Sequence, residues 1–124
     1  MFLDTLHQSI YDPLEVSDKV ASFPMKYILS LDQGTTSSRA VLLNHRAQIV
    51  SMEQMEFAQH YPQPGWVEHD ASDIWNTQIT CAQNCLRKAG VAAQEVAAIG
   101  VTNQRETTVI WDRRTGEPVA PAIV

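Results

Sequence analysis

The sequence predicts an α/β domain with a mixed sheet, and three features of the chain lead to that fold class. Strand-like apolar runs at 26–32 and 38–44 flank a polar segment that contains a glycine, which is typical of a β-hairpin, and a third run at 47–57 continues the antiparallel meander. An apolar repeat with helical spacing follows near 71–89. A run of small apolar residues at 96–102 then predicts a further strand.

The predicted helix carries signals at both ends. Asp70 is a good N-cap, Asp73 lies in the first turn where an acid favours the helix dipole, and Gly90 ends the helix. One apolar stripe runs along the helix at spacings of three and four residues, and we expect it to be the buried face. The stripe consists of Trp75, Ile79, Ala82 and Leu86.

Turns and strands are also expected on either side of this helix. Pro64 and Gly65 fit the central positions of a type II turn, and Trp66 is expected to anchor that loop to the body. The small-residue strand at 96–101 is expected to be buried on both faces. After it, the chain predicts another strand at 108–112 and the beginning of one more at 119–124.

Length and composition indicate one globular domain. The chain has 124 residues, 44% of them hydrophobic. A net charge of −5 without a basic cluster argues against nucleic acid and anionic membrane surfaces as partners. No run reaches the roughly 18 apolar residues of a membrane span. Cys81 and Cys85 share a helix face and show no zinc spacing, so we expect buried reduced thiols and a cytoplasmic protein.

Residues 1–25 read as an extension of unknown role. They combine several acids with a single lysine, Lys19, which fits neither a secretory signal nor a mitochondrial transit peptide. Met25 stands just before the first predicted strand, so translation could equally begin there.

The tip of the predicted hairpin has the composition of an anion cradle. Gly34 permits a backbone angle that is closed to other residues and lets the chain approach a ligand closely. Thr35, Thr36 and Ser37 supply hydroxyls and consecutive N–H donors, which suit phosphate oxygens. The alternative is a surface hairpin in which these residues only make the turn.

Two charged residues flank the cradle. Asp32 ends the first strand, where its carboxylate could hold Mg²⁺ directly or through water. Side chains alternate along a strand, so Ser37 and Arg39 share one side while Ser38 and Ala40 share the other. A guanidinium therefore lies beside the cradle and can fork onto phosphate.

A second polar stretch follows the small-residue strand, at 102–108. A strand that ends in polar residues presents them at the edge of the sheet, where open α/β sheets bind ligands. Arg105 offers only donors and Glu106 only acceptors, and a polyol needs both because each hydroxyl donates and accepts. The alternative is a surface ion pair at the end of a strand.

Three stretches in a fixed order resemble the amino-terminal part of the FGGY carbohydrate kinase family: DQGTTSSR at 32–39, PGWVEHD at 64–70 and TNQRETT at 102–108. The similarity runs from about Lys26 to Val124. The NQRET sequence resembles the glycerol-phosphorylating branch, whereas other members usually carry a Gly-Gln-containing sequence at that place.

The resemblance implies a ribonuclease-H-like α/β domain of the actin, sugar kinase and chaperone ATPase superfamily, incomplete in this chain, with ATP in a cleft between two such domains. Residues 26–124 would be the amino-terminal part of the first kinase domain. The implied parent is a cytoplasmic, homo-oligomeric enzyme that uses ATP and Mg²⁺ to convert glycerol to sn-glycerol 3-phosphate.

The same resemblance assigns Thr35, Thr36 and Ser37, with Gly34 in the same loop, to the nucleotide phosphates. It assigns Arg39 to the phosphate end of ADP.

Asp32 is assigned to the magnesium neighbourhood, and Arg105 and Glu106 become glycerol ligands. The family's general base, an aspartate, is expected beyond Val124, so the resemblance assigns no catalytic residue within the chain. We therefore expect the isolated chain to be inactive.

Two other functions remain open. The chain could belong to another FGGY kinase that acts on a pentulose or a similar polyol. It could also be a non-catalytic nucleotide-binding domain like those of actin and the chaperone ATPases, although such domains have no reason to carry the pair Arg105 and Glu106 after a strand.

Overall fold

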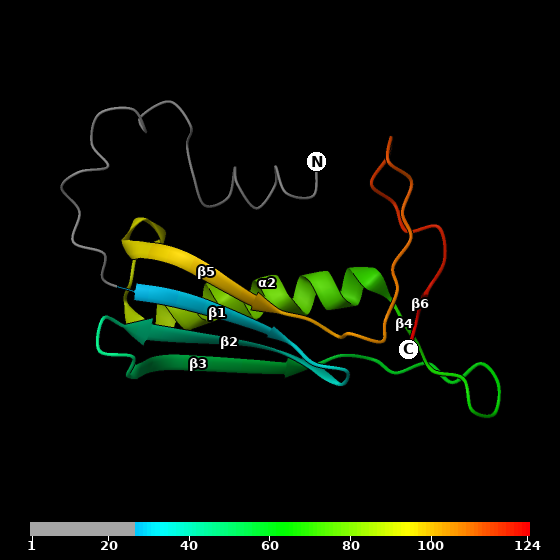
Figure 1. The fold of residues 1–124 in the computed structure, drawn as a ribbon, viewed down its shortest axis with the longest axis horizontal. Coiled ribbons are helices and arrows are strands. Elements are labelled where there is room, and N and C mark those ends of the chain that lie inside the picture. The colour runs from blue at the N-terminus through cyan, green and yellow to red at the C-terminus, as the bar shows by residue number, and fades with distance from the viewer. Residues whose placement is uncertain (1–26) are drawn as a thin grey trace.

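A computed structural model describes residues 27–124, so the predicted extension at 1–25 lies outside the described residues. The fold is a four-stranded sheet with one long helix, α2, packed on one face (Figure 1). The strand order is β3-β2-β1-β5. The strands are β1 (Tyr27–Gln33), β2 (Ser37–Asn44), β3 (Ile49–Glu56) and β5 (Val96–Thr102), and the helix is α2 (Ala71–Ala89).

The pairing confirms the predicted mixed sheet. β1 pairs with β2 and β2 pairs with β3 in antiparallel fashion, which makes the meander. β5 returns after α2 and pairs with β1 in parallel. A parallel partner requires a crossover long enough to reverse the chain, and α2 supplies it. A short 3-10 helix, η2 (Ala93–Glu95), leads from α2 into β5.

The core lies between α2 and one face of the meander. Alternate residues of β1 and β2 point into it, and the helix contributes two cysteines and an alanine, all of them buried. These residues are Leu29, Leu31, Ala40, Leu42, Cys81, Ala82 and Cys85. Cys81 and Cys85 are free thiols, as predicted.

The predicted buried stripe of the helix is only partly correct. Ala82 is buried and Leu86 packs against the core, but Trp75 and Ile79 are only half-buried. The fully packed face is centred on Cys81 and Cys85 instead. The reason is that the helix turns the face with Cys81 and Cys85 toward the core residues of β1 and β2, an orientation that residue spacing alone does not specify.

Both ends of α2 follow the prediction. The Asp70 carboxylate accepts a hydrogen bond of 2.7 Å from the Ser72 N–H, as an N-cap does. Gly90 adopts a left-handed conformation (φ 66°), and its N–H donates to the Arg87 carbonyl. Only glycine adopts this conformation without strain, so the helix ends at this residue.

The loop before the helix forms the predicted turn. The Trp66 N–H donates to the Gln63 carbonyl at 3.0 Å, and Gly65 has a φ of 81°, as the third position of a type II turn requires. The predicted anchoring by Trp66 is wrong, because the indole is 50% exposed.

The carboxyl-terminal segment departs from the prediction. Residues 108–112 form no strand and make only isolated bridges, one from Thr108 to Ile123 and one from Trp111 to Pro118. The predicted strand at 119–124 shortens to β6 (Ala122–Ile123), which pairs with β4 (Glu68–His69). Pro118 and the nearby Pro121 have no N–H to donate, so a continuous ladder cannot form across this segment.

β5 is also less buried than predicted. Val96 is buried, but the other residues of β5 are exposed, with Val101 at 72%. The helix covers mainly β2 and β3, and β5 is an edge strand of the sheet within residues 27–124.

Within residues 27–124, none of the helices combines the length and the apolar character that a membrane span needs.

The exposed edge strand generates a prediction about association. Unpaired backbone groups and apolar side chains on an edge strand are a template for pairing with another chain. We expect the 124-residue chain to self-associate as its concentration rises, and Val101→Lys to weaken this association. Light scattering over a concentration series measures the effect.

The matched control is Val119→Lys, because Val119 is similarly exposed (66%) but lies outside the strands. Equal weakening by both substitutions, or a monodisperse chain at every concentration, would contradict the assignment of β5 as the associating edge.

Candidate functional site

The two polar stretches singled out in the sequence meet at one end of the sheet. β1 and β5 are parallel, and Asp32 near the end of β1 pairs with Thr102 at the end of β5. The chain that follows each strand therefore leaves the sheet on the same side, as Figure 1 shows. The Thr35 hydroxyl at the hairpin tip donates a hydrogen bond of 2.9 Å to the Glu106 carboxylate. This contact joins two residues that are 71 positions apart.

The predicted division of β2 into two sides is confirmed. Ser38 is buried on the helix side, where its hydroxyl lies 2.7 Å from the Thr77 hydroxyl. The Cys81 thiol donates to the Ser38 carbonyl at 3.4 Å, and the Gln78 amide donates to the Arg39 carbonyl at 2.9 Å. Side chains of α2 thus form hydrogen bonds with the helix-facing side of β2. The opposite face of the strand is not covered by the helix.

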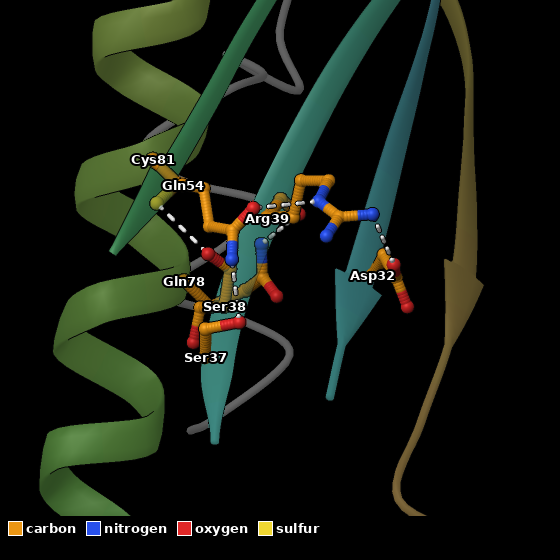
Figure 2. Close-up of polar contacts among 7 residues, drawn as sticks. All are labelled: Asp32, Ser37, Ser38, Arg39, Gln54, Gln78 and Cys81. Atoms are coloured by element: carbon orange, nitrogen blue, oxygen red, sulfur yellow. Dashed lines mark hydrogen bonds and ion pairs between the residues drawn. The ribbon is translucent and has the colours of Figure 1, made fainter. Parts of the chain in front are cut away.

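Arg39 lies on that open face, between two polar neighbours (Figure 2). Its Nε donates to the Gln54 Oε1 at 3.1 Å, and its Nη1 forms an ion pair with the Asp32 Oδ2 at 3.5 Å. The three residues are direct cross-strand partners, so they form one row across the sheet. Gln54 also donates from Nε2 to the Ser37 hydroxyl at 2.9 Å.

Gly34 is required for a different reason from the one predicted. Its φ is not positive, so the expectation of a backbone angle closed to other residues is wrong. Instead its N–H donates to the Ser37 carbonyl at 3.0 Å, and a Cβ on Gly34 would lie 3.1 Å from that oxygen. The tip is so tight that a side chain would press on the opposite strand.

Two backbone N–H groups of the hairpin tip are available as hydrogen-bond donors. Among the hydrogen bonds within residues 27–124, the N–H groups of Thr35 and Thr36 have no acceptor. Thr36 is exposed, and Thr35 and Ser37 are half-buried. Adjacent free N–H groups beside hydroxyls are the arrangement that binds an anion.

Arg105 and Glu106 lie on the exposed loop after β5. The pKa of Glu106 is lowered, first by its own backbone N–H, then by the Thr35 hydroxyl and by the charge of Arg105. The carboxylate is therefore held in its ionised, acceptor-only form, next to a residue that has only donors.

Comparison with known proteins identifies the family. The family model described as "FGGY family of carbohydrate kinases, N-terminal domain" matches residues 27–124. The chain belongs to the FGGY family of carbohydrate kinases. The resemblance noted in the sequence and the fold class that it implied are thereby confirmed.

Individual relatives of this FGGY chain point to one branch. A protein of Herminiimonas arsenicoxydans named glycerol kinase is 62% identical over 99 residues, covering 80% of this chain and 20% of its own length. Another, from Deinococcus radiodurans, is 61% identical over 99 residues, with the same coverage. The chain thus spans about a fifth of the length of these curated relatives.

Solved structures agree with this fold. A Plasmodium falciparum glycerol kinase with ADP superposes with a TM-score of 0.71 at 34% identity, over 81% of this chain and 20% of that one. A xylulose kinase from Rhodospirillum rubrum gives 0.72 at 28% identity, over 79% and 20%. The backbone alone therefore does not separate these two FGGY kinases.

Sequence reasoning missed a buried connection behind the hairpin tip. His69 is fully buried, and its Nε2 lies 2.7 Å from the Gln59 Oε1. The Gln59 Nε2 in turn donates to the Thr35 carbonyl at 3.2 Å. Phe57 packs edge-on against the histidine ring, with the ring centroids 5.0 Å apart. The FGGY chain thus ties the second of its three motif stretches, 64–70, to the cradle through His69 and Gln59.

The protonation of His69 follows from its surroundings. Burial lowers the pKa of His69, and the nearby His60 adds to this, whereas the side chain of Gln104 and the charge of Glu106 act in the opposite direction. The ring is therefore neutral near pH 7, with Nε2 as donor to Gln59. Two polar atoms near this ring are buried without a hydrogen-bond partner among the described residues. They are the His69 Nδ1, which is an acceptor in this tautomer, and the Gln104 Nε2, which is a donor.

The donor set beside the cradle suits a magnesium ion that is held largely by water and phosphate. Within residues 27–124 no three histidines, cysteines or carboxylates cluster as metal ligands. Asp32 is the one carboxylate in the row beside the cradle, and its side chain is 41% exposed. Magnesium keeps several waters and binds through one or two carboxylates plus substrate phosphates, so a single aspartate fits such a site.

The buried histidine generates a prediction about pH and stability. The lowered pKa in the folded state means that the unfolded chain, with a histidine pKa of about 6.5, binds the proton more tightly. The free energy of unfolding should therefore fall as the pH drops below about 6.5 toward the folded-state pKa. Urea unfolding followed by circular dichroism between about pH 7.5 and 5 measures it.

His69→Gln should flatten this part of the pH dependence. His45→Gln is the matched control, because His45 lies exposed in the turn between β2 and β3 and should leave the dependence unchanged. A His69→Gln chain with the same slope as the wild type would show that His69 is not the group responsible.

Proposed function

We propose that residues 27–124 are the amino-terminal part of the first domain of an ATP-dependent kinase that phosphorylates glycerol to sn-glycerol 3-phosphate. Relatives that are about 60% identical over this segment carry the name glycerol kinase. The observation that carries the proposal is the hydrogen bond from Thr35 to Glu106. This hydrogen bond places the loop suited to phosphate next to the residue pair suited to a polyol. A phosphoryl transfer requires its two substrates to be held next to each other in this way.

The hairpin tip would bind the ATP phosphates. The N–H groups of Thr35 and Thr36, with the hydroxyls of Thr36 and Ser37, would donate to phosphate oxygens, and Gly34 keeps the loop tight enough for close approach. Arg39 would exchange part of its contact with Asp32 for a phosphate at the end of the nucleotide. Phosphoryl transfer depends mainly on positioning and charge neutralisation, and these groups supply both.

Magnesium would bind near Asp32, mainly through water and the ATP phosphates. When bound, the ion would neutralise the charge of the transferring phosphoryl group. The carboxylate of Asp32 would orient the ion's water shell, and its ion pair with Arg39 would hold that carboxylate in place.

Arg105 and Glu106 would bind glycerol. Glu106 would accept from two neighbouring hydroxyls, and Arg105 would donate to their oxygens. The Thr35 contact holds Glu106 next to the phosphate loop, so a terminal hydroxyl bound there would face the γ-phosphate. No residue of the chain is proposed as the general base, which is expected beyond Val124. The parent enzyme is proposed to be a cytoplasmic homo-oligomer.

A pentulose kinase remains the second candidate, because a xylulose kinase superposes as well as a glycerol kinase does. A decisive test uses a chimera in which residues 27–124 replace the matching segment of the Herminiimonas arsenicoxydans relative. ADP formation is measured with glycerol, xylulose and related polyols. Glycerol as the preferred substrate supports the proposal, and a preference for a pentulose would overturn it.

Arg105→Ala in this chimera should raise the KM for glycerol far more than the KM for ATP. Losing a hydrogen bond to a charged group typically costs about 1.5–3 kcal/mol, which is roughly tenfold to over a hundredfold in affinity. Steady-state kinetics with each substrate varied separately measures both constants. Arg113→Ala is the control, since Arg113 is also exposed but lies in a turn outside the two polar stretches. Equal effects on both substrates would show that Arg105 does not contact glycerol.

The 124-residue chain alone should be catalytically silent. It would hold the phosphate loop and one side of the glycerol site, without the general base and without closure of a second domain around ATP. Loss of a general base alone typically lowers the rate by about 10²–10⁴. Glycerol-dependent ADP release by the purified chain is compared with that of the chimera, and turnover within tenfold of the chimera would contradict this expectation.

A further inference from the structure

Gln54 of β3 contacts two of the residues proposed to bind phosphate. It lies directly opposite Arg39 in the β2–β3 pairing, on the face of the sheet turned away from α2. Its Oε1 accepts from the Arg39 Nε at 3.1 Å, and its Nε2 donates to the Ser37 Oγ at 2.9 Å. Figure 2 shows the amide spanning the two side chains.

The chemistry of these partners determines which way the amide faces. The Arg39 Nε is a donor and can never accept, so the atom facing it must be the amide oxygen. The amide nitrogen then faces Ser37, and the serine oxygen must accept. The orientation of the Gln54 amide is therefore dictated by its neighbours.

This orientation has a consequence for both contacts. Because the Ser37 oxygen accepts from Gln54, its own O–H proton remains available to donate to an anion. Because Gln54 occupies the Nε of Arg39, the terminal Nη groups are left to bind other acceptors, and one of them already reaches Asp32. Gln54 thus leaves the Ser37 O–H and the terminal Nη groups of Arg39 available to donate to a bound anion.

We propose that Gln54 is a positioning residue for the ATP phosphates, which acts through Ser37 and Arg39. The proposal rests on the proposed function of the cradle and deepens it. Arg39 is a long side chain with a competing partner in Asp32, and the second contact with Gln54 restricts the guanidinium to one orientation. An ordered guanidinium loses less conformational entropy when it forks onto phosphate.

The position of Gln54 makes this role separable from folding. The side chain is exposed and takes no part in the core between α2 and the sheet. Substitutions at exposed positions away from the core usually change stability only slightly. A Gln54 variant should therefore remain folded, and its kinetics should report on the site.

Two variants in the chimera test the proposal. Gln54→Leu removes both contacts at similar size, and it should raise the KM for ATP about tenfold while the KM for glycerol changes less than twofold. Gln54→Glu keeps the acceptor for Arg39 but has no donor, so Ser37 would donate inward, and its charge repels phosphate. We expect a larger loss of ATP affinity for Gln54→Glu than for Gln54→Leu.

The matched controls are Gln63→Leu and Gln63→Glu, at an exposed glutamine in the turn before β4, and they should leave both KM values unchanged. A double-mutant cycle adds the readout that a purely structural role would not give. If Gln54 acts through Ser37 and Arg39, then Gln54→Leu should cost little more in a background that carries both Ser37→Ala and Arg39→Ala. Additive losses, or equal changes in the KM for ATP and for glycerol, would overturn the proposal.

Direct binding of Mg·ADP by calorimetry separates this proposal from the proposed function. If the chimera binds nucleotide but does not phosphorylate glycerol, the substrate assignment fails while the Gln54 effect on Mg·ADP affinity is still measured. If glycerol is phosphorylated but the Gln54 variants bind Mg·ADP as the unsubstituted chimera does, only the role of Gln54 is wrong.

Discussion

The packing of α2 against one face of β2 is the constraint on which the rest of the structure depends. Ala40 and Leu42 are fully buried beneath the helix, and Ser38 joins them through hydrogen bonds to helix side chains. Side chains alternate along a strand, so this burial forces Ser37 and Arg39 onto the opposite face. The direction of the guanidinium is therefore a consequence of apolar packing, and a register slip of one residue would turn it into the core.

The parallel pairing of β1 with β5 provides the second half of the site. Parallel neighbours end at the same edge of a sheet, and a crossover helix is what makes such a pair possible. In this chain the two strand ends bring the hairpin tip and the loop with Glu106 into contact. The loop before α2 reaches the same edge, where His69 binds Gln59 and Gln59 binds the Thr35 backbone. Two segments distant in sequence therefore support the short hairpin tip.

Hydrogen-bond donors gather at this edge of the sheet, although the chain as a whole is acidic. The net charge is −5, yet Arg39, the Gln54 amide and the Ser37 hydroxyl supply donors at this edge, where Asp32 and Glu106 supply carboxylates. Local donors rather than overall charge decide where an anion binds, since charges beyond about 10 Å are largely screened. The membership of the FGGY family is consistent with such an arrangement.

The sequence by itself determined the features that depend on neighbouring residues. The ends of α2 follow from Asp70 and Gly90, the turn follows from Pro64 and Gly65, and the hairpin follows from its alternating strands. Each of these rests on backbone preferences or hydrogen bonds within a few residues. The motif order was also sufficient to indicate the family.

Only the tertiary structure decided features that depend on distant neighbours. It placed the cysteines rather than Trp75 at the centre of the helix interface, left β5 exposed and reduced the strand at 108–112 to isolated bridges. The burial of a residue depends on which element covers it, and no local pattern contains that information.

The same holds for the site. The sequence indicated Thr35 and Arg39 as binding residues but gave no sign of Gln54 or His69, because a glutamine on an alternating strand and a single histidine look like ordinary surface residues. Their roles arise from cross-strand register and from contacts that close only when the chain has folded. Hydrogen bonds between residues far apart in sequence are set by tertiary packing, and this is why the structure was needed to find them.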